Sequence, residues 1–389
     1  MNYLIYDAAI SGHHSEYLEH LILYLKSTTI STGDNYYFIV PEALKVEFPD
    51  LIQKSKDVEC IKWFFISYKV VDDLYKSSLL KRSFKEYNLV KFYAEKTQAS
   101  KVYLLYFNIF QIAFIFKRPR FQVSGILFLQ FYRMNTSGLS NKIKYLRKYI
   151  TTYLYTLNSK IEKIFVLNDS KTVEFLNTRF RNCFSVLPDP IPEHRSLENF
   201  ELRDIYGVNN EKKIFLHAGS LDGRKGTQDI LKSIFELDES VQLKVCLILA
   251  GKTKNPIEEM EIASLYSEVR DKTKAQIIWL NEFVSNELMK SLFEEADFIL
   301  MPYKNPEASS GILGHAMRSN KPVISTDYGL LKEIIEIHKM GILIKLTSPV
   351  FIAEAINKSF SFKYEPSNIN EYLSTHSAGN FASNLLNAD

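Results

Sequence analysis

The chain has 389 residues, 46% of them hydrophobic and 24% charged, which is the composition of an ordinary folded globular protein. This length exceeds what one hydrophobic core usually supports, so we expect two domains. The net charge of +3 indicates no particular class of partner. The three cysteines are scattered and have no metal-type spacing, which indicates a reducing compartment, so we expect a cytoplasmic protein.

Apolar runs alternate with helix-period segments through the first half, and this alternation predicts an α/β domain with a parallel sheet. We expect strands at 3–6, 36–40, 102–106, 125–131 and 164–167, and helices at 16–26 and 171–178. No basic segment precedes the first strand, so we expect no signal peptide. The longest apolar run, 102–116, is shorter than the roughly 18–20 residues that a spanning helix needs, so no transmembrane segment is expected.

The loop after the first strand contains Gly12, His13 and His14. If the two domains face each other, this loop points into the cleft between them, where one of the histidines would meet the substrate. An ordinary polar turn is the alternative explanation.

A basic segment lies between Gln111 and Phe165. It holds ten lysines and arginines but one acidic residue, Glu162, with apolar and aromatic residues interleaved. Such a segment can lie on an anionic membrane. A cytoplasmic protein would then be attached peripherally to the inner face of the membrane. The alternative is a solvated face whose lysine and arginine stems cover apolar surface. No nucleic-acid motif accompanies the charge, so we expect no nucleic-acid partner.

Three prolines at alternate positions from Pro188 to Pro192 stop both helix and strand, and they predict a hinge. The alternation then begins afresh, with strands expected at 214–217, 244–250, 277–280, 298–302 and 323–325 and helices at 227–235, 257–269, 285–294 and 311–318. This pattern predicts a second doubly wound domain. We therefore expect domains at 1–190 and 191–365, and a helical segment at 366–389 that packs back on the first domain.

The loop Gly219–Gly226 places Arg224 and Lys225 beside glycines, between a predicted strand and a helix N-terminus. Glycine lets the backbone approach a ligand, the helix end supplies N–H donors, and the two cations neutralise negative charge. The loop therefore suits a diphosphate, although a loop with solvent-facing cations is the alternative. It lacks the spacing of a P-loop.

A second loop, before the helix predicted from Gly311, carries one carboxylate, Glu307, and two serines, Ser309 and Ser310. Glu307 can accept hydrogen bonds from sugar hydroxyls, and the N–H groups of Ser310 and Gly311 can hold a phosphate or a developing leaving-group charge. His315 lies one helical turn past Gly311, where it could contact the ligand. The alternative is that it is a packed, partly buried histidine without a ligand contact.

No Asp-x-Asp occurs in the sequence, and the other histidines are dispersed. Transferases that hold a nucleotide-sugar diphosphate through a metal-bound Asp-x-Asp are therefore disfavoured. We expect no metal and no cofactor.

These motifs together resemble the carboxyl-terminal domain of the retaining glycosyltransferases of family 4, also called group 1, which have the GT-B fold. The resemblance rests on Ala218-Gly219, Lys225-Gly226, Leu249-Ala250-Gly251, the run Ala296–Pro302, Glu307 through Gly311, Ala316-Met317, Lys321-Pro322, Asp327, Gly329 and Glu333, which follow in the family's order. The first half is less clearly similar. The implied fold has two Rossmann-like domains that face each other across a cleft.

The resemblance implies a nucleoside diphosphate sugar as donor, bound by the second domain, and a glycan or lipid-linked acceptor on the first. Lys225 would hold the diphosphate and Glu307 the hydroxyls of the sugar, and the anomeric configuration would be retained without a metal. The implied donor-binding residues are Gly219, Ser220, Arg224, Lys225, Glu307, Ser309, Ser310, Gly311, Ile312 and His315. The acceptor side would include Gly12, His13 and Gln130, and we predict catalytic roles for Lys225, Glu307, His13 and His14.

Three positions depart from the family pattern. His315 stands where the family has a second acid that binds the ribose, and Ser220 where it often has an arginine, for which Arg224 can substitute. The histidine expected in the first domain is missing, and Gln130 can stand in its place.

The sequence thus favours a glycosyltransferase that acts on a nucleoside diphosphate sugar, with a role in polysaccharide biosynthesis. The departures keep two alternatives open, a weakly active or non-catalytic nucleotide-sugar-binding protein and a sugar-nucleotide epimerase on the same fold.

Overall fold

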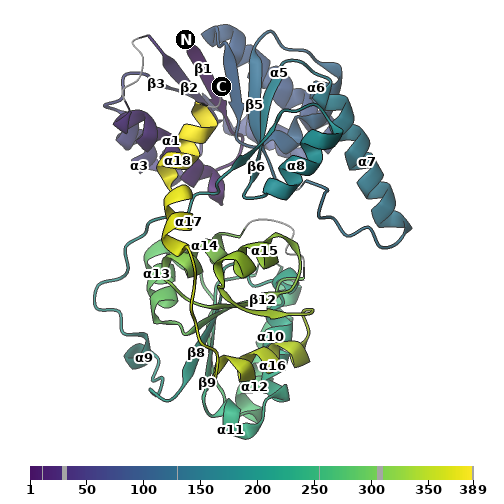
Figure 1. Ribbon diagram of the computed structural model, residues 1–389. Helices are drawn as coiled ribbons and strands as arrows, with labels where there is room; N and C mark the ends of the chain where they lie inside the picture. The colour runs from purple at the N-terminus through teal and green to yellow at the C-terminus, as the bar shows by residue number, and fades with distance from the viewer. Residues whose placement is uncertain (11, 29–32, 129, 254, 305–309, 388–389) are drawn as a thin grey trace. The chain divides into compact units, whose positions relative to one another are not determined.

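The computed structural model describes residues 1–10, 12–28, 33–128, 130–253, 255–304 and 310–387. The chain forms two compact units: unit 1 comprises Met1–Pro190 and His376–Asp389, and unit 2 comprises Ile191–Thr375. Each is an α/β domain built on one parallel sheet, as predicted, and the chain passes between them after Pro190 and after Thr375 (Figure 1).

Unit 1 contains a seven-stranded sheet with the strand order β3-β2-β1-β4-β5-β6-β7. The strands are β1 (Asn2–Tyr6), β2 (Asn35–Pro41), β3 (Ile61–Ile66), β4 (Lys101–Leu104), β5 (Gln122–Leu127), β6 (Ile161–Leu167) and β7 (Phe184–Leu187). The helices are α1 (His13–Ser27), α2 (Leu44–Glu47), α3 (Pro49–Ser55), α4 (Tyr68–Lys76), α5 (Leu79–Thr97), α6 (Gln111–Phe116), α7 (Leu139–Thr156), α8 (Ser170–Arg179) and α18 (Ala378–Leu386), with a 3-10 turn, η1, at Phe107–Ile109.

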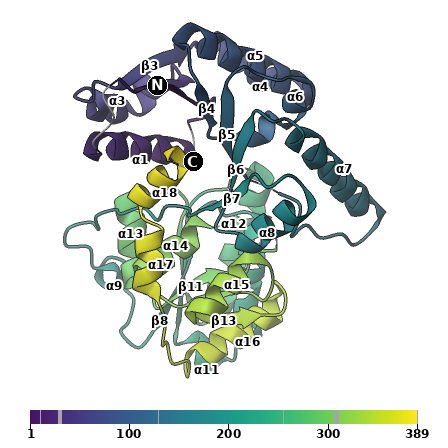
Figure 2. The same ribbon diagram turned by 45° about the horizontal axis from the view of Figure 1, so that its top comes forward.

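Helices cover both faces of this sheet, which is why its strands read as continuous apolar runs. One buried cluster joins the sheet to α5, α6, α7 and α8, and the other joins it to α1, α3 and α18. The last helix packs on the first, with the ring of Phe381 4.6 Å from that of Tyr17 (Figures 1 and 2).

Unit 2 contains a six-stranded sheet with the strand order β10-β9-β8-β11-β12-β13. The strands are β8 (Lys213–Ala218), β9 (Val245–Ala250), β10 (Gln276–Leu280), β11 (Phe298–Met301), β12 (Val323–Thr326) and β13 (Gly341–Ile344). The helices are α9 (Leu202–Ile205), α10 (Thr227–Ser233), α11 (Glu239–Gln242), α12 (Pro256–Lys272), α13 (Asn286–Glu295), α14 (Gly311–Arg318), α15 (Gly329–His338), α16 (Pro349–Ser359) and α17 (Ile369–Thr375), with 3-10 turns η2 (Gly223–Lys225) and η3 (Ile234–Glu236).

The helices of unit 2 also form two layers. One buried cluster holds α13, α14 and α15 against the sheet, and the other holds α10, α12 and α16 (Figure 1). The segment predicted to return to the first domain is divided, because α17 belongs to unit 2 and the chain from His376 onward to unit 1.

Two local predictions for unit 1 were wrong. The strand predicted at 125–131 ends at Leu127, where the Phe128 N–H donates to Asn108 Oδ1 at 2.9 Å rather than to a neighbouring strand. His13 and His14 do not lie in a loop but in the first turn of α1, which starts directly after Gly12. Gly12 has φ 72°, a left-handed conformation that glycine adopts at little cost.

Both sheets reverse their strand order once, between β1 and β4 in unit 1 and between β8 and β11 in unit 2. In open parallel sheets, ligands bind outside the carboxyl ends of the strands at such a switch point. The segments that follow β1, β4, β8 and β11 are therefore the places to look for a site.

Candidate functional site

The glycine loop after β8 closes in a way that only glycine permits. Gly219 has φ 96° and Gly226 has φ 79°. A Cβ at Gly219 would lie 2.7 Å from Lys225 Nζ, and one at Gly226 would lie 2.6 Å from the carbonyl oxygen of Pro302. The carboxylate of Asp222 accepts the backbone N–H of Lys225 at 3.1 Å and thereby fixes the 3-10 turn η2. The loop therefore folds back over its own strand and carries the lysine with it.

Lys225 is the cation that this loop positions. Its Nζ donates to the Ala218 carbonyl at 3.4 Å and lies 5.5 Å from the ring centroid of Tyr303, which follows β11. Burial lowers the pKa of Lys225 to about 8, and Arg224 adds to this while Asp222 opposes it. Within the described ranges, no carboxylate lies within salt-bridge distance of Nζ. A partly buried ammonium in this setting is suited to an external anion.

The start of α14 lies against the same lysine. The Ile312 side chain would be 3.5 Å from a Cβ at Gly219. Burial raises the pKa of Tyr303 to about 12, and a hydrogen bond with Ser310 opposes this rise. The first N–H groups of a helix have no partner within it, so Gly311 and Ile312 offer backbone donors beside the Lys225 ammonium. The structure thus brings five of the predicted donor residues together: Gly219, Lys225, Ser310, Gly311 and Ile312.

Two other predicted donor residues lie at the rim of the loop and turn toward Asp222. Arg224 pairs with Asp222 at 3.3 Å, and its side chain is 59% exposed. The Ser220 hydroxyl donates to the same carboxylate at 3.4 Å. Arg224 can still add positive potential, but it contacts Asp222 rather than the pocket around Lys225.

His315 is partly buried on α14. Its ring centroid lies 5.4 Å from that of Phe293 on α13 and 6.1 Å from that of His194. Glu307 and Ser309, which we predicted to bind the donor, lie outside the described residues. The predicted role of Glu307 therefore stays a prediction.

The sequence reasoning missed His217, which lies beneath the loop. It is fully buried, with Nδ1 2.9 Å from the Leu300 carbonyl and Nε2 3.0 Å from the Thr227 hydroxyl. Burial lowers the pKa of His217 to about 4, so the ring is neutral at physiological pH. Through these two hydrogen bonds, His217 connects β8 with β11 and with the start of α10. In the sequence, His217 lies within an apolar run, and that run does not indicate this role.

In unit 1, His14 forms a partly buried pair with Asp7, which the sequence reasoning also missed. The Nδ1 of His14 lies 2.6 Å from Asp7 Oδ2, and Asp7, at the end of β1, is 1% exposed. A carboxylate accepts hydrogen bonds, so we assign the proton of this contact to Nδ1, which leaves Nε2 for another partner. His13 is exposed instead, and its pKa is raised chiefly by a hydrogen bond to Glu16.

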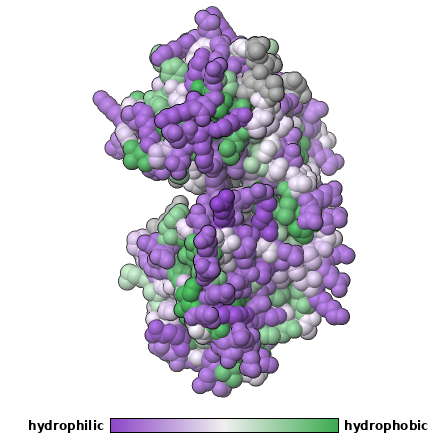
Figure 3. Space-filling model, turned by 90° about the vertical axis from the view of Figure 1, so that its left-hand side faces the viewer, coloured by the Kyte–Doolittle hydropathy of each residue, from purple (hydrophilic) through white to green (hydrophobic). Residues whose placement is uncertain are grey.

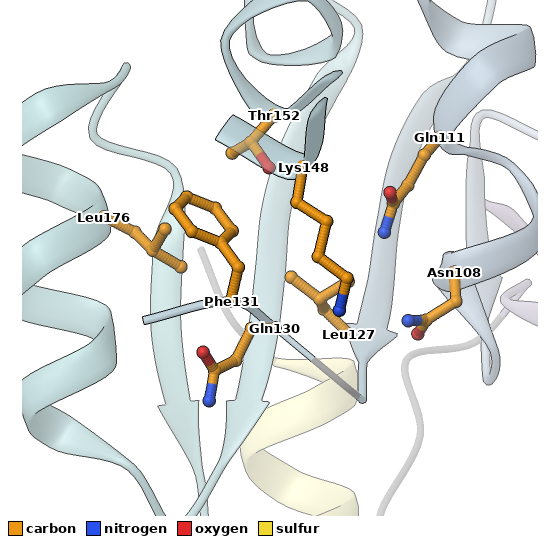
Figure 4. A pocket seen from close by; sticks show the side chains of 8 residues that line it. All are labelled: Asn108, Gln111, Leu127, Gln130, Phe131, Lys148, Thr152 and Leu176. Atoms are coloured by element: carbon orange, nitrogen blue, oxygen red, sulfur yellow. The ribbon is translucent and has the colours of Figure 1, made fainter. Parts of the chain in front are cut away.

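A pocket of about 210 Å³ lies in unit 1 beside the ends of β4 and β5 (Figure 4). Its lining includes Gln130, the residue predicted for the acceptor side, together with Asn108, Gln111, Leu127, Phe131, Lys148, Thr152 and Leu176. The side-chain oxygens of Asn108 and Gln130 accept the N–H groups of Phe128 and Tyr132, which leaves their NH₂ groups as donors. With the Lys148 ammonium, these donors suit hydroxyl or phosphate oxygens.

Among the described residues, no three His, Cys, Asp or Glu side chains gather as a metal site. We therefore consider two candidate sites among the described residues. One is the lysine site of unit 2, made by Gly219, Lys225, Tyr303 and the start of α14. The other is the polar pocket of unit 1, the unit that also contains the His14–Asp7 pair.

Comparison with known proteins shows which family the second half of the chain resembles. Residues 198–374 match the sequence model of the family "Glycosyl transferases group 1". An uncharacterized glycosyltransferase of Methanocaldococcus jannaschii is 26% identical over 165 residues, which are 42% of this chain and 40% of that protein. The chain thus matches about two fifths of the length of this curated relative.

Solved structures share the fold across the whole chain. WaaG, a glycosyltransferase involved in lipopolysaccharide biosynthesis, has a TM-score of 0.63 at 16% identity and covers 100% of this chain and 98% of its own. Anabaena Alr3699/HepE in complex with UDP and glucose has a TM-score of 0.62 at 15% identity and covers 98% and 95%. The two-domain fold is GT-B, as predicted, and residues 198–374 of this chain are similar to the group 1 glycosyltransferases.

Proposed function

We propose that the protein is a glycosyltransferase that binds a nucleoside diphosphate sugar at the lysine site of unit 2 and transfers the sugar to a glycan or lipid-linked acceptor. The observation that carries this proposal is the partly buried Lys225 ammonium, held beside Gly219 and the N-terminus of α14. Among the described residues no carboxylate pairs with this ammonium, and a diphosphate would supply the anion. The family of residues 198–374 supports the same reaction class.

In the proposed reaction, the bond between the anomeric carbon and the diphosphate breaks, and the acceptor hydroxyl forms a bond to that carbon from the same face. The hydroxyl proton passes to the departing phosphate oxygen. Lys225 and the N–H groups of Gly311 and Ile312 stabilise the negative charge that develops on the leaving group. This stabilisation needs no metal, because fixed cations and helix donors supply the positive charge. The configuration at the anomeric carbon is retained.

The polar pocket of unit 1 is the proposed acceptor site. Its NH₂ groups from Asn108 and Gln130 would donate to acceptor hydroxyls, and Lys148 would pair with an acidic or phosphate group of the acceptor. His14, oriented by Asp7, presents Nε2 as a hydrogen-bond acceptor for a substrate hydroxyl.

The test is a transfer assay with UDP- and GDP-sugars and a mixture of glycan and lipid-linked acceptors, with EDTA present. We expect transfer of the sugar, with the anomeric configuration of the donor preserved in the NMR spectrum of the product. Inversion would contradict the proposed mechanism, and loss of activity with EDTA would contradict metal independence.

A non-catalytic or weakly active protein is the alternative that one observation favours. His315 stands in place of the family's second acid and packs against Phe293. Tight binding of a donor without transfer or hydrolysis would support this alternative. A changed sugar from donor alone would instead identify an epimerase.

A further inference from the structure

Helix α7 has two apolar faces, and only one of them packs against the rest of unit 1, chiefly against α6 and aromatic side chains. Tyr145, Tyr149 and Tyr155 pack into the core. On the other face, six large apolar side chains are between 47% and 76% exposed: Leu139, Ile143, Leu146, Ile150, Tyr153 and Leu157. Their spacing alternates between four and three residues, so they form one stripe along the helix, roughly 27 Å long at the usual rise per residue. We call this set the α7 stripe.

Basic residues flank the α7 stripe. The segment 139–157 contains Lys142, Lys144, Arg147 and Lys148 and no Asp or Glu. At 100° per residue, Lys142 lies on one side of the stripe and Arg147 on the other, and both are exposed. At the end of the stripe, the Asn158 side chain donates to the carbonyl of Lys117 at 2.9 Å, which brings a further exposed cation to the same place.

The exposed apolar residues of α12 lack this arrangement. Ile257 and Met260 on α12 are 68% and 74% exposed, but Glu258, Glu259 and Glu261 lie among them. On the face of the molecule shown in Figure 3, hydrophobic residues lie in small groups between hydrophilic ones. Scattered apolar residues are normal on a protein surface, whereas a continuous stripe marks an interaction surface.

We propose that the α7 stripe lies in the interface of a membrane that contains anionic lipids, with the stripe among the acyl chains and Lys142 and Arg147 against the headgroups. One observation favours this occupant over a second copy of the chain. A symmetric pair of α7 helices would bring the cationic flanks together, and no acid on the helix could compensate them. No helix of the described ranges is long and apolar enough to cross a membrane.

This attachment goes beyond the proposed sugar transfer and does not depend on it. It also explains why one helix carries both an exposed stripe and Lys148, which lines the polar pocket (Figure 4). A membrane-bound acceptor would approach the pocket from the surface on which α7 lies.

The experiment is co-sedimentation of the full chain with vesicles of phosphatidylglycerol and phosphatidylcholine, and with vesicles of phosphatidylcholine alone. We expect binding to the anionic vesicles that weakens with added salt. The charge variant Lys142→Gln with Arg147→Gln should bind about thirtyfold more weakly, given the usual contribution of one basic residue at a membrane surface. The stripe variant Ile143→Asn with Ile150→Asn should also lose binding.

The matched control is Ile257→Asn with Met260→Asn, which removes two equally exposed apolar residues from α12 and should bind as the wild type does. Circular dichroism spectra report whether each variant is folded, and the charge variant changes only exposed side chains. Absent binding to anionic vesicles at low salt would overturn the proposal, as would equal losses in the control and stripe variants. A dimer that the stripe variant abolishes would assign the surface to self-association instead.

Discussion

Replacing Lys225 by methionine separates the role of this residue in binding from its role in folding. Burial lowers the pKa of Lys225 from 10.5 to about 8, which means that keeping the ammonium charged costs the folded state up to about 3 kcal/mol at pH 7. Lys225→Met removes that cost and keeps a side chain of similar length. We therefore expect no loss in the free energy of unfolding at pH 7.

Ligand binding, in contrast to stability, should be weakened by Lys225→Met. A hydrogen bond between charged groups contributes about 1.5–3 kcal/mol, so the variant should bind a diphosphate about 10- to 150-fold more weakly. In the wild type, only the protonated amine attracts the anion. Affinity should therefore be constant below about pH 7 and fall by up to about tenfold per pH unit as the pH rises above about 8. The variant should lack this fall.

Isothermal titration with pyrophosphate, UDP and GDP from pH 6.5 to 9.5 measures both effects, and urea denaturation measures stability. Lys232→Met, which removes an exposed lysine from the neighbouring α10, is the control for a general loss of positive charge. Equal pyrophosphate affinities of the wild type and Lys225→Met would refute the assignment of the diphosphate site. A strongly destabilised Lys225→Met would refute the argument from burial.

Three further predictions concern single residues. Gly219→Ala should cost about 1–2 kcal/mol of stability in urea denaturation and displace the Lys225 ammonium, because φ is 96° and the new Cβ would lie 2.7 Å from Nζ. The control is Gly379→Ala in α18, where the new Cβ has no atom within 4 Å and should not destabilise the protein. Burial lowers the pKa of His217 from 6.5 to about 4. The stability that depends on the neutral ring is therefore complete above pH 6.5 and is lost as the pH falls toward 4. Between pH 7 and pH 4.5, the free energy of unfolding should drop by about 2–3 kcal/mol more in the wild type than in His217→Gln. Asp7→Asn should slow transfer by about 100-fold without changing pyrophosphate affinity, because it disturbs the tautomer of His14 but not unit 2; a parallel loss of affinity would contradict the separation of the two sites.

The sequence alone determined the two α/β units and the motifs of the second. Buried parallel strands read as apolar runs, and the loop Gly219–Gly226 and the helix start at Gly311 were recognisable because glycines and cations at strand ends are local features. The helix over Gly311–Arg318 was predicted with the bounds that the structure has. The region 54–101 was left unassigned, and it holds β3, α4 and α5.

Only the tertiary structure decided which of these residues meet. The strand order places the loop after β8 beside the segment after β11, and this neighbourhood brings Tyr303 and Ile312 to Lys225. The pairs His14–Asp7 and His217–Thr227 depend on side-chain directions at the ends of strands, and spacing along the chain does not specify these. The basic segment was visible in the sequence, but the exposure of the α7 stripe follows from which face of the helix packs into the core of unit 1.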